Sequence, residues 1–156
     1  MFKVFLHLAF LFEFLTLTLG QDHEKICREK WTLFKASSAC YKKFPSHECF
    51  DSAEANCVHE GGHLVSFHSQ KEMQFITDRY SQSSIDRLWI GFHKVGNTWE
   101  WTDKTEVDYT FWIDGEPKDH ENQLPIAAFT YLFDENKWLT REKNETSGYI
   151  CKYLLK

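Results

Sequence analysis

Residues 88 to 103 read Leu88-Trp-Ile-Gly-Phe-His-Lys-Val-Gly-Asn-Thr-Trp-Glu-Trp-Thr-Asp103. The two short aromatic-rich runs in this stretch, Leu88–Phe92 and Thr98–Thr102, are typical of β-strands. Trp89 has a large ring that favours a core position, and Gly91 suits a place where two backbone segments approach closely. We therefore expect Trp89 and Trp101 to be buried packing residues and not ligand contacts.

Two helices are expected before this stretch. The first is indicated by apolar residues at helical spacing, and Gly61-Gly62 ends the pattern. These residues are Phe50, Ala53, Cys57 and Val58. The second is predicted over Ser69–Tyr80, because Ser69-Gln-Lys-Glu72 is a capping box and the apolar residues that follow share one face. A short strand, Leu64–Phe67, is expected between the two helices.

Further strands are expected after residue 103, and they complete the prediction of the fold class. The candidate strands are Ile126–Phe133, Lys137–Leu139 and Tyr149–Leu154. Two helices followed by a run of strands predict an α+β fold, with the helices packed on short antiparallel sheets. The long polar segment Lys104–Pro125 has no such pattern, and irregular segments of this length are usually functional. We expect the ligand site there.

The first twenty residues have the pattern of a secretory signal peptide. Lys3 precedes two apolar runs, and Thr18 and Gly20 are small enough for a cleavage site. Glu13, near the middle, disfavours a membrane anchor. The expected organisation is therefore a signal peptide at 1–20 and one domain at 21–156, in a secreted, extracellular protein. No other stretch is long and apolar enough to span a membrane.

Composition excludes several classes of function. The 156-residue chain has 18 Lys and Arg against 23 Asp and Glu, a formal charge of −5, and no basic run. It therefore has no electrostatic reason to bind nucleic acid or an anionic membrane. Aromatic residues make up 17% of the chain, which favours a packed core. Because no hydrolase, metalloprotease or phosphate-loop motif occurs, we expect no enzyme activity and no metal centre.

The motifs along the chain resemble the C-type lectin domain family. The resemblance extends from Cys27 to Tyr153, nearly the whole of the predicted domain. The motifs are Cys27-x3-Trp31 with Cys40-Tyr41, Ala53-x3-Cys57 with Gly61-Gly-His-Leu-Val-Ser66, Leu88-Trp-Ile-Gly91, Trp99-Glu-Trp-Thr-Asp103, Phe111-Trp-x2-Gly-Glu-Pro117 and Tyr149-Ile-Cys151. The resemblance implies the long form of the C-type lectin-like fold, with an opening hairpin and a long ligand loop.

The resemblance also implies the disulfide pairing. It pairs Cys57 with Cys151 and Cys27 with Cys40, and leaves Cys49 over. An odd cysteine in a secreted chain is either a buried, inert thiol or an intermolecular disulfide, so a covalent dimer through Cys49 is one interpretation. The family's inner disulfide is missing here, because no cysteine lies between Cys57 and Cys151. Aromatic packing, such as that of Trp112 and Phe129, is an alternative means of fixing the loop.

The resemblance places the ligand site on the long loop, and the sequence departs from the family there. The candidate ligand-binding residues are Trp112, Glu116, Pro117, Lys118, Glu121 and Asn122. Family members bind sugar through Ca²⁺, which takes 6–8 oxygen ligands. Here Lys118 follows Glu116-Pro117 in place of an amide or acid, and Leu139-Thr140 replaces an Asn-Asp pair after a tryptophan. We therefore expect no calcium cofactor.

The resulting prediction is a secreted, non-enzymatic recognition protein that binds a glycan, glycoconjugate or protein ligand without calcium. The resemblance implies a role in innate defence. One alternative is a calcium-dependent lectin with a rearranged site on Glu116, Glu121 and Asn122, and another is a disulfide-linked structural subunit. Asn144-Glu-Thr146 is an N-glycosylation acceptor, and a glycan there is expected to crowd the family's sugar site.

Overall fold

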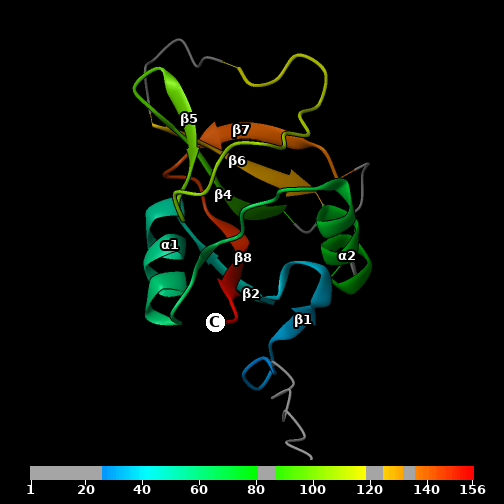
Figure 1. The fold of residues 1–156 in the computed structure, drawn as a ribbon. Helices are drawn as coiled ribbons and strands as arrows, with labels where there is room; N and C mark the ends of the chain where they lie inside the picture. Colours follow the sequence, from blue (N-terminus) through cyan, green and yellow to red (C-terminus); the bar gives the residue numbers. More distant parts are fainter. Residues whose placement is uncertain (1–25, 81–86, 119–124, 132–135) are drawn as a thin grey trace, which may run out of the picture.

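The computed structural model describes residues 26–80, 87–118, 125–131 and 136–156 (Figure 1). The predicted signal peptide lies outside these residues. No helix in the described ranges is long and apolar enough to cross a bilayer. The elements in chain order are β1 (Thr32–Phe34), a 3₁₀ turn (Lys35–Ser37), β2 (Ala39–Glu48), α1 (Phe50–His59), β3 (His63–Leu64), α2 (Gln70–Tyr80), β4 (Arg87–Val95), β5 (Thr98–Trp101), β6 (Ile126–Tyr131), β7 (Trp138–Glu142) and β8 (Ser147–Leu154).

The strands form one connected sheet in the order β1-β2-β8-β4-β6-β7, with β3 paired to β8 and β5 paired to β4. Strands β1 and β2 form the opening hairpin that the resemblance implied, and Leu33 pairs with Cys40 in it. All the described strand pairs are antiparallel except β4 and β8, which run parallel at Leu88↔Gly148 and Trp89↔Tyr149. The predicted α+β fold is thus confirmed, and its sheet is mixed where purely antiparallel strands were expected.

Helix α1 begins and ends where the sequence indicates. Phe50, Ala53 and Cys57 are buried on one face, whereas Val58 is 52% exposed and does not belong to that face. Cys57 is bonded to Cys151 across 94 residues, which ties α1 to β8. Gly62 follows the helix where an added Cβ would lie 2.3 Å from the carbonyl oxygen of Lys152. The helix end is therefore pressed directly against β8.

Helix α2 begins with a capping arrangement on Ser69 and Glu72. The backbone amide of Glu72 donates to the hydroxyl of Ser69 at 3.2 Å, as the capping box predicts. The carboxylate of Glu72 accepts a hydrogen bond from the amide of His68 at 2.9 Å, one residue earlier than in the standard box. Met73 and Ile76 are buried against the sheet. The predicted helix is therefore confirmed.

Two aromatic clusters fill the core, and the alternation of β4 separates them. Leu88 and Ile90 belong to the cluster that contains the α2 residues Met73 and Ile76, and Trp89 belongs to the cluster that contains the buried residues of α1. Successive strand residues point to opposite faces, so each helix covers its own cluster. Figure 1 shows α1 and α2 on the two sides of β8. Trp89 and Trp101 are 1% and 0% exposed, which confirms their predicted packing role.

The predicted strand Leu64–Phe67 is shorter in the structure. Only His63 and Leu64 form a strand, β3, which pairs with β8. The amide of the next residue, Val65, donates a hydrogen bond to the carbonyl oxygen of Ile150 at 2.8 Å. The carbonyl oxygen of Val65 accepts a hydrogen bond from the amide of Gly91, also at 2.8 Å. The segment therefore bridges β8 and β4, and its strand pairing with β8 ends after Leu64.

Candidate functional site

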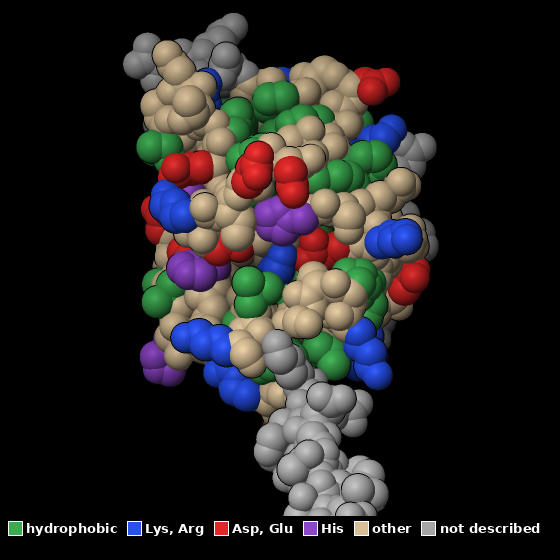
Figure 2. Space-filling model, in the orientation of Figure 1, with side chains coloured by type: hydrophobic (Ala, Val, Ile, Leu, Met, Phe, Trp, Pro, Cys, Tyr) green, Lys and Arg blue, Asp and Glu red, His purple; other side chains and the backbone are tan. Residues whose placement is uncertain are grey.

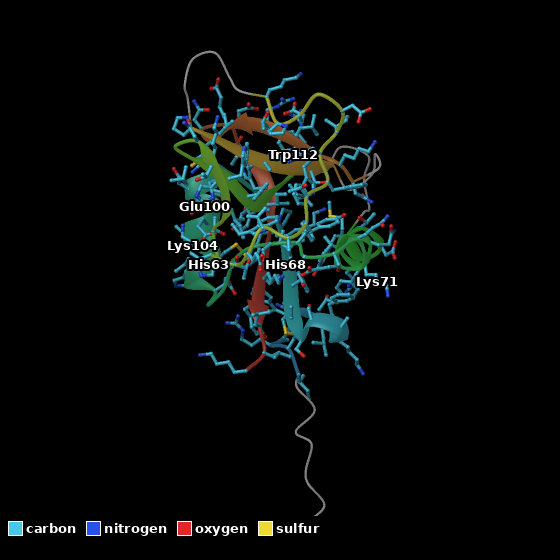
Figure 3. The ribbon with its side chains drawn as sticks, turned by 45° about the horizontal axis from the view of Figure 1, so that its top comes forward. His63, His68, Lys71, Glu100, Lys104 and Trp112 are labelled. Carbon is cyan, nitrogen blue, oxygen red and sulfur yellow. A yellow bond between two sulfur atoms is a disulfide. The ribbon has the colours of Figure 1, made fainter. Side chains whose placement is uncertain are left out.

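The described part of the long loop is anchored by Trp112. The carbonyl oxygen of Phe111 accepts a hydrogen bond from the backbone amide of Trp138 at 2.7 Å. The amide of Ile113 donates a hydrogen bond to the carbonyl oxygen of Trp138 at 3.0 Å. The Trp112 ring lies 5.0 Å from Trp99 and 5.7 Å from Trp138, both edge to face. Such pairs contribute about 0.5–1.5 kcal/mol each beyond their buried area. Trp112 thus fixes the loop to β7, and Figure 3 shows it where the loop passes this end of the sheet.

Of the two aromatic residues proposed to fix the loop, Trp112 packs between the described part of the loop and β7. Phe129 lies in the other cluster, with its ring 5.9 Å from that of Trp89. A second anchor comes from His68, before α2, whose Nδ1 lies 2.7 Å from an Asp108 carboxylate oxygen. No sequence pattern predicts this pair, because 40 residues separate its members.

The carboxylate of Glu116 lies inside the protein, at the base of the predicted site. Its side chain is only 3% exposed. Oε2 accepts hydrogen bonds from the backbone amide of Thr140 at 3.1 Å, the hydroxyl of Thr140 at 2.5 Å and the amide of Lys118 at 2.9 Å. The Lys118 ammonium lies 3.9 Å from Oε1. Thr140 is thus a hydrogen-bond donor to Glu116, through both its backbone amide and its hydroxyl.

The described surroundings of Glu116 do not fit a calcium ion. Ca²⁺ needs 6–8 oxygen ligands at about 2.3–2.6 Å, whereas Glu116 is met by N–H and O–H donors and by a lysine ammonium. Two like unit charges 4 Å apart repel by about 4 kcal/mol at an effective dielectric constant of 20. Within the residues that the structure describes, no group of three or more His, Cys, Asp or Glu side chains is arranged to hold a metal.

The other predicted ligand-binding residues divide into two groups. Pro117 and Lys118 are exposed and follow Glu116 at the surface. Glu121 and Asn122 lie outside the described residues. The exposed, described part of the predicted site is therefore basic and aliphatic, next to a carboxylate that is already hydrogen-bonded.

The cysteines lie as the resemblance implied. Cys27 is bonded to Cys40, and Cys49 is free and partly exposed. The thiol of Cys49, which precedes α1, donates to the Ser52 hydroxyl at 3.2 Å. A shallow pocket beside this thiol is lined by Cys49, Asp51, Pro125, Glu142, Lys143 and Asn144. The dimer through Cys49 stays a prediction.

Asn144 is exposed in the turn between β7 and β8, beside the start of α1. The carbonyl of the preceding Lys143 accepts from the amide of Phe50 at 2.9 Å, which holds this turn against the helix. A glycan would therefore project from the α1 side of the turn. Its presence, and the expected crowding of the sugar site, stay predictions.

Sequence reasoning missed a buried polar network next to the sheet. The Lys152 ammonium, 5% exposed, lies 2.7 Å from Oε1 of Glu72, which also accepts from the hydroxyl of Tyr41. The ammonium donates as well to the Ser66 carbonyl at 2.9 Å. Burial, and the nearby Glu72 charge, raise the pKa of Tyr41 far above its usual range. No sequence pattern distinguishes such an internal Lys–Glu pair from surface charges.

The disulfides, the two helices on a mixed sheet and the long loop fixed beside β7 fit one family. A family model for the lectin C-type domain matches residues 46–153. This chain belongs to the C-type lectin domain family. The match starts within β2 and ends at Tyr153 within β8, so it includes both helices and the long loop.

Relatives of this C-type lectin-like chain include proteins with different ligands. It is 40% identical over 96 residues to the type-2 ice-structuring protein of Brachyopsis segaliensis, covering 60% of this chain and 54% of the relative. It is 30% identical over 128 residues to C-type mannose receptor 2 of Homo sapiens, covering 81% and 8% respectively. The chain thus spans about half the length of the first relative and less than a tenth of the second.

Two solved structures are similar over most of the chain. A calcium-independent type II antifreeze protein matches with a TM-score of 0.72 at 31% identity, covering 84% of this chain and 96% of that one. The cow carbohydrate-recognition domain of CD23, solved with a GlcNAc2Man3 oligosaccharide, matches with a TM-score of 0.72 at 27% identity, covering 85% and 98%. The same fold therefore occurs in proteins that differ in ligand.

Proposed function

We propose that this protein is a secreted, non-catalytic recognition protein that binds a glycan, glycoconjugate or protein ligand without calcium. The observation that carries the proposal is the set of hydrogen bonds to Glu116. Thr140 and Lys118 supply donors to the carboxylate that a calcium site in this family would use as a ligand. A cation would have to displace these donors and approach the Lys118 ammonium.

Secretion is supported by two independent features. Residues 1–20 have the charged start, apolar run and small residues of a signal peptide. The two disulfides are of the kind that persists in oxidising compartments. A role in innate defence is the process that the family resemblance implies for such a secreted binder.

A thermal melt in millimolar calcium and in excess EDTA tests the calcium part of the proposal. A ligand that binds only the folded state stabilises it by RT ln(1 + [L]/Kd), about 2.7 kcal/mol at a hundred times Kd. We expect the same melting temperature in both solutions. A rise of several degrees in calcium that Glu116→Gln abolishes would establish the alternative, a rearranged calcium-dependent site.

Glycan and protein arrays probed in EDTA test the binding part. We expect at least one ligand whose binding is unchanged when calcium is added. If the folded protein binds no glycan and no protein in either solution, the recognition proposal is wrong. The alternative of a disulfide-linked structural subunit predicts a dimer band on non-reducing electrophoresis of secreted protein, and Cys49→Ser removes it.

Ice is a second candidate ligand, favoured by the two antifreeze relatives. The 40% identity to an ice-structuring protein is the higher of the two sequence matches given above, and one similar structure is described as calcium-independent. An ice-binding function predicts thermal hysteresis and faceted ice crystals in EDTA. Freezing behaviour equal to that of an unrelated protein at the same concentration would rule this candidate out.

A further inference from the structure

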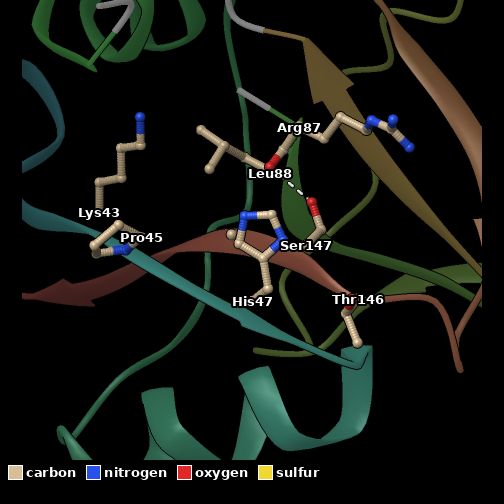
Figure 4. A pocket seen from close by; sticks show the side chains of 8 residues that line it. Lys43, Pro45, His47, Arg87, Leu88, Thr146 and Ser147 are labelled. Carbon is tan, nitrogen blue, oxygen red and sulfur yellow. Dashed lines mark hydrogen bonds between the residues drawn. The ribbon is translucent and has the colours of Figure 1, made fainter. Parts of the chain in front are cut away.

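A pocket lies where β2 separates from β8, away from Glu116 and β7. The pairing of β2 with β8 changes register between Phe44↔Tyr149 and Glu48↔Ser147, so three β2 residues face the single residue Gly148. One of the three, Pro45, has no backbone N–H for the ladder. The pocket that opens there has a volume of about 240 Å³, is open to solvent and is shown in Figure 4. Its lining residues are Lys43, Pro45, His47, Arg87, Leu88, Thr146, Ser147 and Gly148.

The described lining of this pocket has one sign of charge. Lys43 on β2 and Arg87 on β4 stand on either side of the His47 ring (Figure 4), and no acidic side chain is among the described residues that line it. The chain as a whole has a formal charge of −5. On the face shown in Figure 2, acidic and basic side chains are interspersed. A concave site lined by one sign concentrates ligands of the opposite sign.

Two side chains of the pocket, Arg87 and His47, have donors available to a ligand. Within the described residues, the guanidinium of Arg87 and the ring of His47 have no hydrogen-bond or ion-pair partner. Lys43 donates to the Tyr80 carbonyl at 3.4 Å. The hydroxyl of Ser147 donates to the carbonyl of Arg87 at 2.7 Å, which fixes the start of β4 against β8 and so holds the rim of the pocket in place.

We propose that this pocket binds the anionic groups of a glycan chain, either sulfate esters or carboxylates. The guanidinium of Arg87 matches such groups with paired N–H donors, and the ammonium of Lys43 adds a compact charge. Because the two cations stand on opposite flanks, the pocket suits a chain that bears several anions better than a single small ion. This binding is independent of the proposed function at Glu116, which lies on another part of the fold.

The test is a titration of the whole secreted protein with fluorescent oligosaccharides of equal length at low salt. One probe is sulfated, one has only carboxylates and one is neutral. The pocket variant is Arg87→Gln, and the matched control is Lys71→Gln, which removes an exposed charge from α2. Neither side chain makes a hydrogen bond to another described residue, and thermal melts confirm that both variants fold.

We expect the protein to bind at least one anionic probe more tightly than the neutral one. Arg87→Gln is expected to weaken that binding about tenfold and Lys71→Gln less than twofold, and adding His47→Gln weakens it further. The preferred anionic probe identifies sulfate or carboxylate as the ligand group. If Arg87→Gln and Lys71→Gln weaken the binding equally, the effect comes from the net charge of the protein and not from the pocket, and the proposal is wrong. Equal affinity for the neutral probe, or loss of anionic binding in Glu116→Gln alone, would also overturn it.

Discussion

Thr140 donates two hydrogen bonds, from its backbone amide and from its hydroxyl, to the same carboxylate oxygen of Glu116. The pair joins the loop segment at Glu116 to β7 across 24 residues of sequence. With 3% of its side chain exposed, Glu116 depends on these donors, because a buried carboxylate without partners is strongly unfavourable. The region where the family places its ligand is therefore held together here by protein hydrogen bonds.

Thr140→Val should lower the free energy of unfolding by about 1–3 kcal/mol, because it removes the hydroxyl donor and leaves the Glu116 carboxylate short of a partner. Urea denaturation followed by tryptophan fluorescence measures the change. Thr140→Ser keeps the hydroxyl and is expected to lose much less. A small loss in Thr140→Val together with a larger loss in Thr140→Ser would mean that the methyl group, and not the hydrogen bond, matters at this position.

Lys152→Met should lower the free energy of unfolding by about 3–5 kcal/mol, because it leaves the Glu72 carboxylate buried without its cation. The double variant Lys152→Met with Glu72→Gln is expected to recover part of the loss, since no unpaired charge then remains. Denaturant melts of both variants provide the comparison. A double variant that is less stable than Lys152→Met would contradict this explanation.

Gly91→Ala tests the close backbone approach predicted from the sequence. An added Cβ would lie 2.7 Å from the Thr102 hydroxyl and 2.8 Å from the Leu64 carbonyl, so we expect a loss of about 3 kcal/mol. Gly96→Ala is the control, because no atom lies within 4 Å of its added Cβ and only its positive φ of 58° is strained. Its expected cost is about 1 kcal/mol, measured in the same denaturation series.

His93 should make the protein less stable in mild acid. Burial, with help from the nearby Lys143 charge, lowers the pKa of His93 below its usual value. Below about pH 7 the unfolded chain, with a histidine pKa of about 6.5, then binds more protons than the folded protein. The free energy of unfolding therefore falls as the pH drops through the unfolded pKa towards the folded one.

The variant His93→Gln is expected to show a smaller loss of stability than the natural protein between about pH 7.5 and about pH 5.5, as measured by thermal melts at each pH. His59→Gln, on the exposed last turn of α1, is the control and should keep the slope of the natural protein. If His93→Gln keeps that slope too, the acid sensitivity arises elsewhere.

Local patterns predicted the elements and their core faces well. The capping box at Ser69, the glycines after α1 and the aromatic strand around Trp89 all depend on residues close in sequence. The extent of β2 was missed, because its second half, which contains Pro45, separates from β8 and has no alternating pattern. The parallel pairing of β4 with β8 was missed as well, because it joins strands about 60 residues apart.

The site was predicted less completely than the fold. The loss of the acid and amide ligands at Lys118 and Thr140 is visible in the sequence, and it predicts that Glu116 holds no calcium ion. Sequence alone does not reveal that Thr140 turns its hydroxyl to Glu116, because that contact depends on how the loop lies against β7. The pocket beside Arg87 also brings together three separate parts of the chain, and no single motif marks it.

The pairing of β2 with β8 has a consequence for biosynthesis. Strand β2 leaves the ribosome on the order of 100 residues before its partner in the ladder, which at about 5–20 residues per second is a delay of roughly 10 s. During that interval Ala39, Cys40 and Tyr41, which are buried in the folded protein, can pair with β1 but have no β8 on their other side. The β2–β8 part of the sheet can therefore form only after β8 has been synthesised, later than the hairpin of the neighbouring strands β1 and β2.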